Sequence, residues 1–280
     1  MADSHFISRS LLRNWERRPG ELHYFDFRDC RVKPSSAKAM YVSEKPYPDD
    51  VEMWLDRTIE SPLGDYLKKC RLTLVAGVRN MPKPVDREAR ALRLAVALQG
   101  PRTALAKTGD RTLIDLVRMG DGFFDEFVKV QDHSVNSYVV AFGAERLHFP
   151  TVGRVRLPMI GAFALFLPMT PGLFAISTPK AFDRDTLDRI LGALEGWPTA
   201  LSVGLHSERV VLPPDGSDPA VVASAVPFLR AQAKALHERL RQLNARIGAD
   251  PREAWRPESP LSRRYVAELL RTLDAQRKSK

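Results

Sequence analysis

The sequence predicts an α+β protein with a mainly helical first half, a small mixed or antiparallel sheet in the middle and a C-terminal helical hairpin. Apolar residues recur at helical spacing over much of residues 49–130. Between residues 135 and 180, short apolar runs alternate with Gly and Pro, which is typical of short strands. After residue 218, apolar residues alternate in steps of four and three, as in a long amphipathic helix. We expect an α+β body over residues 1–215 and a basic helical extension packed on it over residues 216–280.

The first half is predicted to contain an arm, a hairpin and several helices. Residues 1–20 are expected to form a short helix or an ordered arm. The aromatic residues 22–27 predict a strand that pairs with residues 31–40 across a turn at Asp29–Cys30. The expected helices are one that begins at Asp49, residues 63–72 after Pro62, one that begins at Asp86 and is interrupted at Gly100–Pro101, and residues 111–130, divided by Gly120 and Gly122.

The middle of the chain is predicted to hold short strands and one helix. The expected strands are residues 137–142, 146–149, 163–167 and 174–177. A helix is expected to follow Asp183 and to end at Gly196, because Asp is a favourable helix cap. Residues 201–212 are expected to form one or two strands.

The strongest periodic pattern lies near the C-terminus. It consists of Val222, Val226, Leu229, Ala233, Leu236, Leu240, Leu243 and Ile247. Asp218–Pro219 favours a helix start, Pro227 a kink and Gly248 a stop. The pattern fits either a coiled coil that forms a homodimer or a helix that packs within its own chain. We favour the second interpretation, in which the partners are Tyr265, Leu269, Leu270 and Leu273 of the final helix, because the heptads are few.

The composition indicates a globular protein with an uneven positive charge. The chain has 280 residues, a net charge of +9, 44% hydrophobic residues and two cysteines, which excludes a disordered chain, a disulfide framework and a four-cysteine zinc site. Residues 230–280 hold 13 Lys and Arg against 6 Asp and Glu, whereas the other 229 residues hold 30 against 28. This basic end predicts contact with nucleic acid. An ordinary solvated surface is the alternative, because Arg outnumbers Lys 31 to 12 throughout the chain.

The sequence also makes several classes of protein improbable. We expect no membrane contact, because no run reaches the roughly 18 apolar residues that a bilayer requires. The first residues lack the apolar segment of a secretory signal, so we expect a cytoplasmic protein with reduced thiols. The short motifs that bind nucleotides, zinc or calcium are missing, and neither cysteine belongs to a C-x-x-C pair. We therefore expect no cofactor and no metal ion.

Several short segments carry a further pattern: residues 5–7 (HFI), 12–15 (LRNW), 22–26 (LHYFD), 35–38 (SSAK), 52–55 (EMWL), 59–60 (IE), 99–103 (QGPRT) and 165–171 (LFLPMTP). Together they resemble a bacterial family known only as domain of unknown function 4238, over roughly residues 4–178. Ser8 stands where the family has Pro, and residues 154–158 lack the acidic residue of the family's S-D-x-P turn. The resemblance implies no known reaction. If that acidic residue serves chemistry in relatives, this chain is expected to lack the activity or to bind a different ligand.

Four polar residues of these segments form a candidate site. His5, Glu60, Gln99 and Arg102 lie on separate predicted elements that could converge. An Arg would neutralise a phosphodiester, and a His or Glu would move a proton. The alternative is a buried polar network, with Glu60–Arg102 as a structural ion pair, that attaches the N-terminal arm to the helices. We favour this alternative.

Two hypotheses about function follow. The leading one is a bacterial protein that binds or processes nucleic acid through its basic C-terminal helices, in host defence or on a mobile element. The competing one is a non-enzymatic interaction module that dimerises through residues 222–247. Whether the protein is an enzyme is left open.

Overall fold

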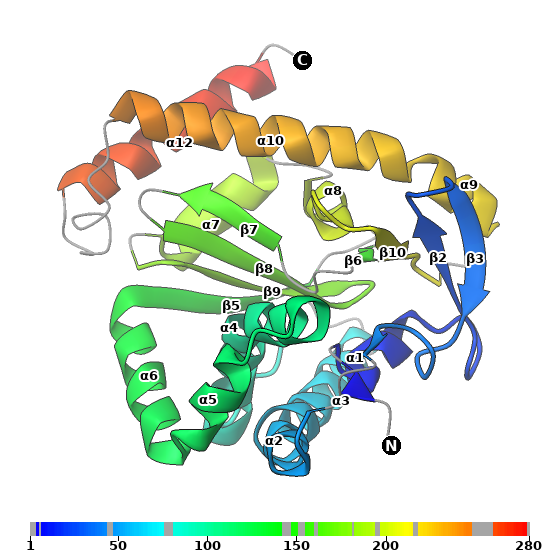
Figure 1. Ribbon diagram of the computed structural model, residues 1–280. Coiled ribbons are helices and arrows are strands. Elements are labelled where there is room, and N and C mark those ends of the chain that lie inside the picture. The colour runs from blue at the N-terminus through cyan, green and yellow to red at the C-terminus, as the bar shows by residue number, and fades with distance from the viewer. Residues whose placement is uncertain are drawn as a thin grey trace.

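The computed structural model describes residues 4–5, 7–43, 47–75, 81–141, 147–150, 155–159, 162–180, 182–193, 197–214, 218–247 and 260–278. In this part of the chain, helices surround two four-stranded antiparallel sheets (Figure 1). The predicted α+β class is confirmed. No described helix is both long and apolar enough to cross a lipid bilayer.

The N-terminal arm is fastened to the body by its apolar side chains. It comprises β1 (Ser4–His5), α1 (Arg9–Leu12) and a 3-10 turn, η1 (Arg13–Trp15), and β1 pairs with β4 (Val42–Ser43). Ile7, Leu12 and Trp15 are fully buried. The Trp15 indole donates to the Leu147 carbonyl at 2.9 Å. Burial of these side chains explains why so short an arm is ordered.

The predicted hairpin is present and is extended into a sheet. β2 (Leu22–Asp26) pairs with β3 (Arg31–Ser35), and the sheet order is β3-β2-β10-β6. β10 (Arg209–Val211) and β6 (Phe149–Pro150) complete it. The predicted strand over residues 201–212 is wrong in its first part, because residues 197–203 form helix α8 (Trp197–Val203). A short apolar run such as Leu201–Val203 has no period that separates strand from helix.

The helices of the first half pack against one another and against both sheets. Their bounds are α2 (Asp49–Leu55), a π-helical turn η2 (Asp56–Glu60), α3 (Ser61–Val75), α4 (Asp86–Thr108), α5 (Thr112–Arg118) and α6 (Asp121–Ser134). The predicted division between α5 and α6 is confirmed at Gly120, where a φ of 85° ends the helix.

Two predictions about these helices are wrong. Residues 49–75 are one continuous helical segment, because η2 joins α2 to α3. Helix α4 also continues through Gly100–Pro101, although Pro removes a helical hydrogen bond. Side chains on both sides of Pro101 are buried, among them Leu98, Arg102 and Leu105. The packing of these side chains outweighs the tendency of Pro to end a helix.

The second sheet is antiparallel, which is one of the two arrangements that the sequence predicted, and has the order β5-β9-β8-β7. Its strands are β5 (Val135–Ala141), β7 (Val155–Met159), β8 (Ala162–Thr170) and β9 (Leu173–Pro179). The sequence did not predict β7, which contains Pro158 and lies at the sheet edge, where a missing N–H is tolerated. Helix α7 (Arg184–Ala193) follows, and Asp183 caps it by accepting from the Thr186 amide at 2.8 Å.

The C-terminal segment is a pair of helices packed on the body. Asp218 caps α9 (Pro219–Ser224), and α10 (Val226–Ile247) begins beside Pro227. Helix α10 crosses α8 and β7 and contacts α12 (Pro260–Lys278) (Figure 1). The heptad residues Val226, Ala233, Leu236, Leu240 and Leu243 are all buried within this single chain. Their burial favours the intramolecular interpretation; Gly248 and the side chains of Ile247 and Leu273 lie outside the described residues.

Replacing Leu236 by Ala is expected to destabilise the monomer. Leu236 is 4% exposed, so its truncation should lower the free energy of unfolding by about 2–5 kcal/mol. Urea denaturation measures the change, and the exposed Lys234→Ala on the same helix, expected to change it by less than about 0.5 kcal/mol, is the control. A wild-type dimer in light scattering that Leu236→Ala converts into an equally stable monomer would contradict this packing.

Candidate functional site

Two of the four predicted site residues meet. The Arg102 guanidinium donates to Glu60 Oε1 at 2.7 Å, and its side chain is only 7% exposed. The second Glu60 oxygen accepts the Ser8 hydroxyl at 2.9 Å. The Tyr47 ring lies 5.7 Å from the guanidinium carbon of Arg102. One carboxylate therefore connects the N-terminal arm, the α2–α3 segment and α4.

The backbone places Glu60 and Arg102 on two helical segments, η2 and α4, that pack against each other. Glu60 is the last residue of η2, and its neighbour Ile59 is buried in the core. Arg102 lies in α4 directly after Pro101, where the helix continues and packs against η2. A π-helical turn widens the helix by one residue per turn and changes the direction of the side chains that follow. Such turns are frequent at functional sites, so the junction between α2 and α3 is a candidate site.

A pocket of about 360 Å³ opens beside the pair. Its walls are formed by Arg9, Tyr47, Glu52, Met53, Leu55, Asp56, Glu60 and Arg102. Among these described residues, three side chains are carboxylates and two are guanidiniums, so together they carry a net negative charge at neutral pH. A phosphodiester would be repelled by this balance.

The protonation states of the pocket side chains also favour a structural role. Burial alone lowers the pKa of Arg102, but the Glu60 carboxylate and Tyr47 raise it above its ordinary value. Burial raises the pKa of Tyr47. Arg102 is therefore permanently charged and Tyr47 is neutral at physiological pH, so neither exchanges protons readily.

For the other two predicted residues, Gln99 and His5, the described contacts are with other groups. Gln99 is 3% exposed, and its amide nitrogen donates to Thr103 Oγ1 at 3.4 Å, one turn along α4. The His5 backbone pairs with Val42, but the His5 side chain lies outside the described residues. Ser8 and Tyr47 were missed. No spacing or periodicity in the sequence indicates that the Ser8 hydroxyl or the Tyr47 ring lies beside Glu60 and Arg102.

A second concave region lies between the basic C-terminal helix and α7. This α7–α12 groove has a volume of about 430 Å³. It is lined by Thr186, Arg189, Arg263, Val266, Ala267, Leu270, Arg271 and Asp274. Arg271 pairs with Glu268 on its own helix at 3.0 Å, whereas Arg189 forms no ion pair with any described residue. Among the lining residues that the structure describes, three arginines from two helices thus accompany one acidic residue.

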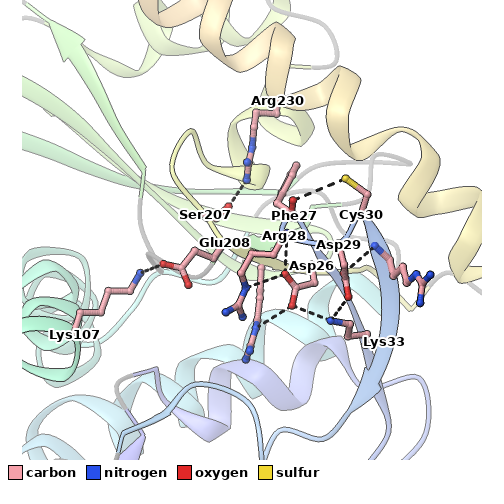
Figure 2. Close-up of polar contacts among 12 residues, drawn as sticks. Asp26, Phe27, Arg28, Asp29, Cys30, Lys33, Lys107, Ser207, Glu208 and Arg230 are labelled. Atoms are coloured by element: carbon pink, nitrogen blue, oxygen red, sulfur yellow. Dashed lines mark hydrogen bonds and ion pairs between the residues drawn. The ribbon is translucent and has the colours of Figure 1, made fainter.

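A third group of charges surrounds the buried carboxylate of Asp26, beside the turn of the β2–β3 hairpin. Figure 2 shows Arg28 and Lys33 reaching this carboxylate from different sides. Arg28 Nε is 3.3 Å from Oδ1, Lys33 Nζ is 3.2 Å from Oδ2, and Arg209 Nε is 3.6 Å from Oδ2. Burial raises the pKa of Asp26, but hydrogen bonds from the Arg28 amide and Lys33 outweigh this effect and hold the pKa below its ordinary value.

The described residues offer no metal site. No group of three or more His, Cys, Asp or Glu side chains in this part of the chain is arranged to hold a metal ion.

Comparison with protein-family models, curated proteins and solved structures gives no match for the chain. A function is therefore inferred from the geometry of the three charged regions.

Replacing Glu60 by Gln should be strongly destabilising. The change leaves the Arg102 charge buried without its counter-ion, which we expect to lower the free energy of unfolding by about 2–4 kcal/mol. Urea denaturation measures this loss. The exposed Lys129–Glu126 pair supplies the control, because Glu126→Gln should cost less than about 0.5 kcal/mol. Adding Arg102→Met to Glu60→Gln should recover part of the stability; an unchanged Glu60→Gln protein would show that the pair contributes little.

Asp26 should make stability depend on acid pH. Its pKa is lower in the folded protein than the ordinary value of 3.8, so ionised Asp26 stabilises the fold above that value, and the contribution disappears as the pH falls through the folded pKa. Asp26→Asn should therefore be less stable at pH 7 and lose less stability than wild type between about pH 4 and 2. Denaturation curves at a series of pH values measure both differences. Parallel pH profiles for the two proteins would contradict the assignment.

Proposed function

We propose that the protein binds nucleic acid through the α7–α12 groove. The observation that carries the proposal is the convergence of Arg189, Arg263 and Arg271 on one concave surface, where Asp274 is the single acidic residue among the described lining residues. The planar guanidinium group with its five N–H donors suits phosphate recognition better than an ammonium does. The groove helix α12 belongs to residues 230–280, the part of the chain with the excess of positive charge.

The dimensions of the groove suit an extended polyanion. Arg263 and Arg271 are eight residues apart on α12, which corresponds to about 12 Å along the helix axis. Arg189 faces them from α7. Cations distributed over such a length neutralise several phosphates, and the resulting release of counter-ions makes binding steeply dependent on salt.

The geometry supports binding more than processing. The described lining of the Glu60–Arg102 pocket, the candidate site that the sequence predicted, is net negative, and both oxygens of Glu60 accept hydrogen bonds from the protein. We therefore interpret the pair as structural. Dimerisation through the heptad face would require exposure of side chains such as Leu236 and Leu243, which are buried within the chain.

Removing the groove arginines should weaken binding to nucleic acid of any base sequence. We expect Arg189→Gln and Arg271→Gln each to lower affinity and to reduce the slope of log affinity against log salt by about one. Fluorescence anisotropy with mixed-sequence single- and double-stranded DNA and RNA, at about 50 and 200 mM salt, measures both quantities.

The control is Arg118→Gln, which removes the same charge from an exposed side chain on α5, on the opposite side of the molecule (Figure 1). It should change affinity by less than a factor of about two. If wild type shows no binding at the lower salt concentration, or if all three variants weaken equally, the groove is not the binding surface.

A further inference from the structure

The charges around Asp26 form a second cationic surface that the proposed function does not use. We name it the hairpin cation cluster and define it by Arg28, Lys33 and Arg209, which contact the Asp26 carboxylate, and by Arg31, which lies directly opposite Asp26 on β3. Strand register explains the gathering, because Arg31 and Arg209 are the direct cross-strand partners of Asp26 on the two neighbouring strands. Direct partners in an antiparallel sheet project from the same face. Lys33, two residues after Arg31, projects from that face as well.

The opposite face of the same strands is covered. Phe25 and Val210 project away from the cluster and pack with Ala223 and Val226 at the start of the C-terminal helices. The hairpin cation cluster therefore lies on the side of the sheet that faces away from α10. The α7–α12 groove involves none of its residues, so the two surfaces can be tested separately.

The cluster is held in place without being neutralised. The four cations and the two carboxylates beside them, Asp26 and Asp29, together carry a net charge of +2. Arg31 is exposed and forms no ion pair with any described residue. Arg31 therefore adds positive charge to the cluster without forming an ion pair that would stabilise the hairpin.

The contacts of Asp26 direct donors outward. Arg28 uses Nε for Asp26, and its side chain is 61% exposed, so the terminal nitrogens of its guanidinium extend beyond the carboxylate. Lys33 is 36% exposed and also pairs with Asp29 at 2.6 Å. The Tyr24 ring supports Arg209, whose guanidinium carbon lies 5.4 Å from the ring centre. The buried carboxylate thus holds the side chains of Arg28, Lys33 and Arg209 in place before any ligand arrives, which reduces the entropy cost of binding.

We propose that the hairpin cation cluster binds a terminal phosphate group. A phosphate monoester carries a charge of about −1.5 to −2 at neutral pH, which matches the net charge of the cluster. Its oxygens accept paired hydrogen bonds from guanidinium groups such as those of Arg28 and Arg31. The group belongs either to a small phosphorylated molecule or to the end of a nucleic-acid strand, and the two sources share this chemistry.

The test is a titration of the ¹⁵N-labelled full chain with inorganic phosphate, followed by NMR at ionic strength held constant with sodium chloride. In wild type we expect saturable shifts of the amides of residues 26–33. Arg31→Gln should weaken phosphate binding at least about fivefold, because it removes one guanidinium from a site that depends on charge-assisted hydrogen bonds. Its fold should be unchanged, since Arg31 has no ion-pair partner among the described residues.

Arg18→Gln is the matched control. Arg18 is also exposed, and it lies just before β2, at the end of the hairpin opposite to Asp26. Its removal subtracts the same net charge and should change phosphate affinity by less than a factor of about two. Equal weakening by both variants would indicate general charge attraction and would overturn the site. So would wild-type shifts that fail to saturate by about 10 mM phosphate, a concentration that corresponds to very weak binding.

Competition separates the two sources of phosphate. A 5′-phosphorylated oligonucleotide is compared with its unphosphorylated form and with a mononucleotide, each added to wild type in the presence of inorganic phosphate. Displacement that requires the 5′-phosphate supports a strand end, and stronger displacement by the mononucleotide supports a small molecule. Displacement by the unphosphorylated strand alone would overturn the terminal-phosphate proposal. Groove variants such as Arg189→Gln should leave phosphate affinity unchanged, so either proposal can fail without the other.

Discussion

The ion pair between Glu60 and Arg102 is the constraint on which the first half of the structure depends. A guanidinium that is 7% exposed needs a carboxylate partner, because an unpaired buried charge costs several kcal/mol. The partner comes from the π-helical turn between α2 and α3, so the two helical segments must pack in one register. Because Glu60 also accepts the Ser8 hydroxyl, the N-terminal arm is held at the same point. Ile7 and Trp15 then bury their side chains against the body.

The contrast between the charged regions explains how one basic chain can use its arginines for different purposes. Arg102 is buried and paired, so it stabilises the fold and is unavailable to a ligand. Arg189 and Arg31 belong to the same residue type, but they stand on surfaces with fewer carboxylates than cations and have no ion-pair partner among the described residues. The net charge of +9 therefore says less about binding than the places where the charges remain uncompensated.

The local elements with strong signals could be predicted from the sequence. The hairpin at Asp29–Cys30, the helix division at Gly120 and the caps at Asp183 and Asp218 agree with the structure, since turn and capping residues act on their immediate neighbours. The errors occur where tertiary packing overrides a local preference. Pro101 does not end α4, because buried side chains on both sides of it hold the helix together. The edge strand with Pro158 was missed, because its register is set by pairing with β8.

By itself, the sequence determined the α+β class, most of the elements and the basic character of the C-terminal end, because periodicity, turn residues and composition are local properties. It also indicated that Glu60 and Arg102 belong to one polar group. Only the tertiary structure decided that Ser8 and Tyr47 join them and that Gln99 bonds to its own helix. It also decided that the heptad face is turned inward and that Asp26 gathers cations from three strands or turns. The physical reason is that electrostatic energy depends on distances in space between groups far apart in the chain, which no local pattern contains.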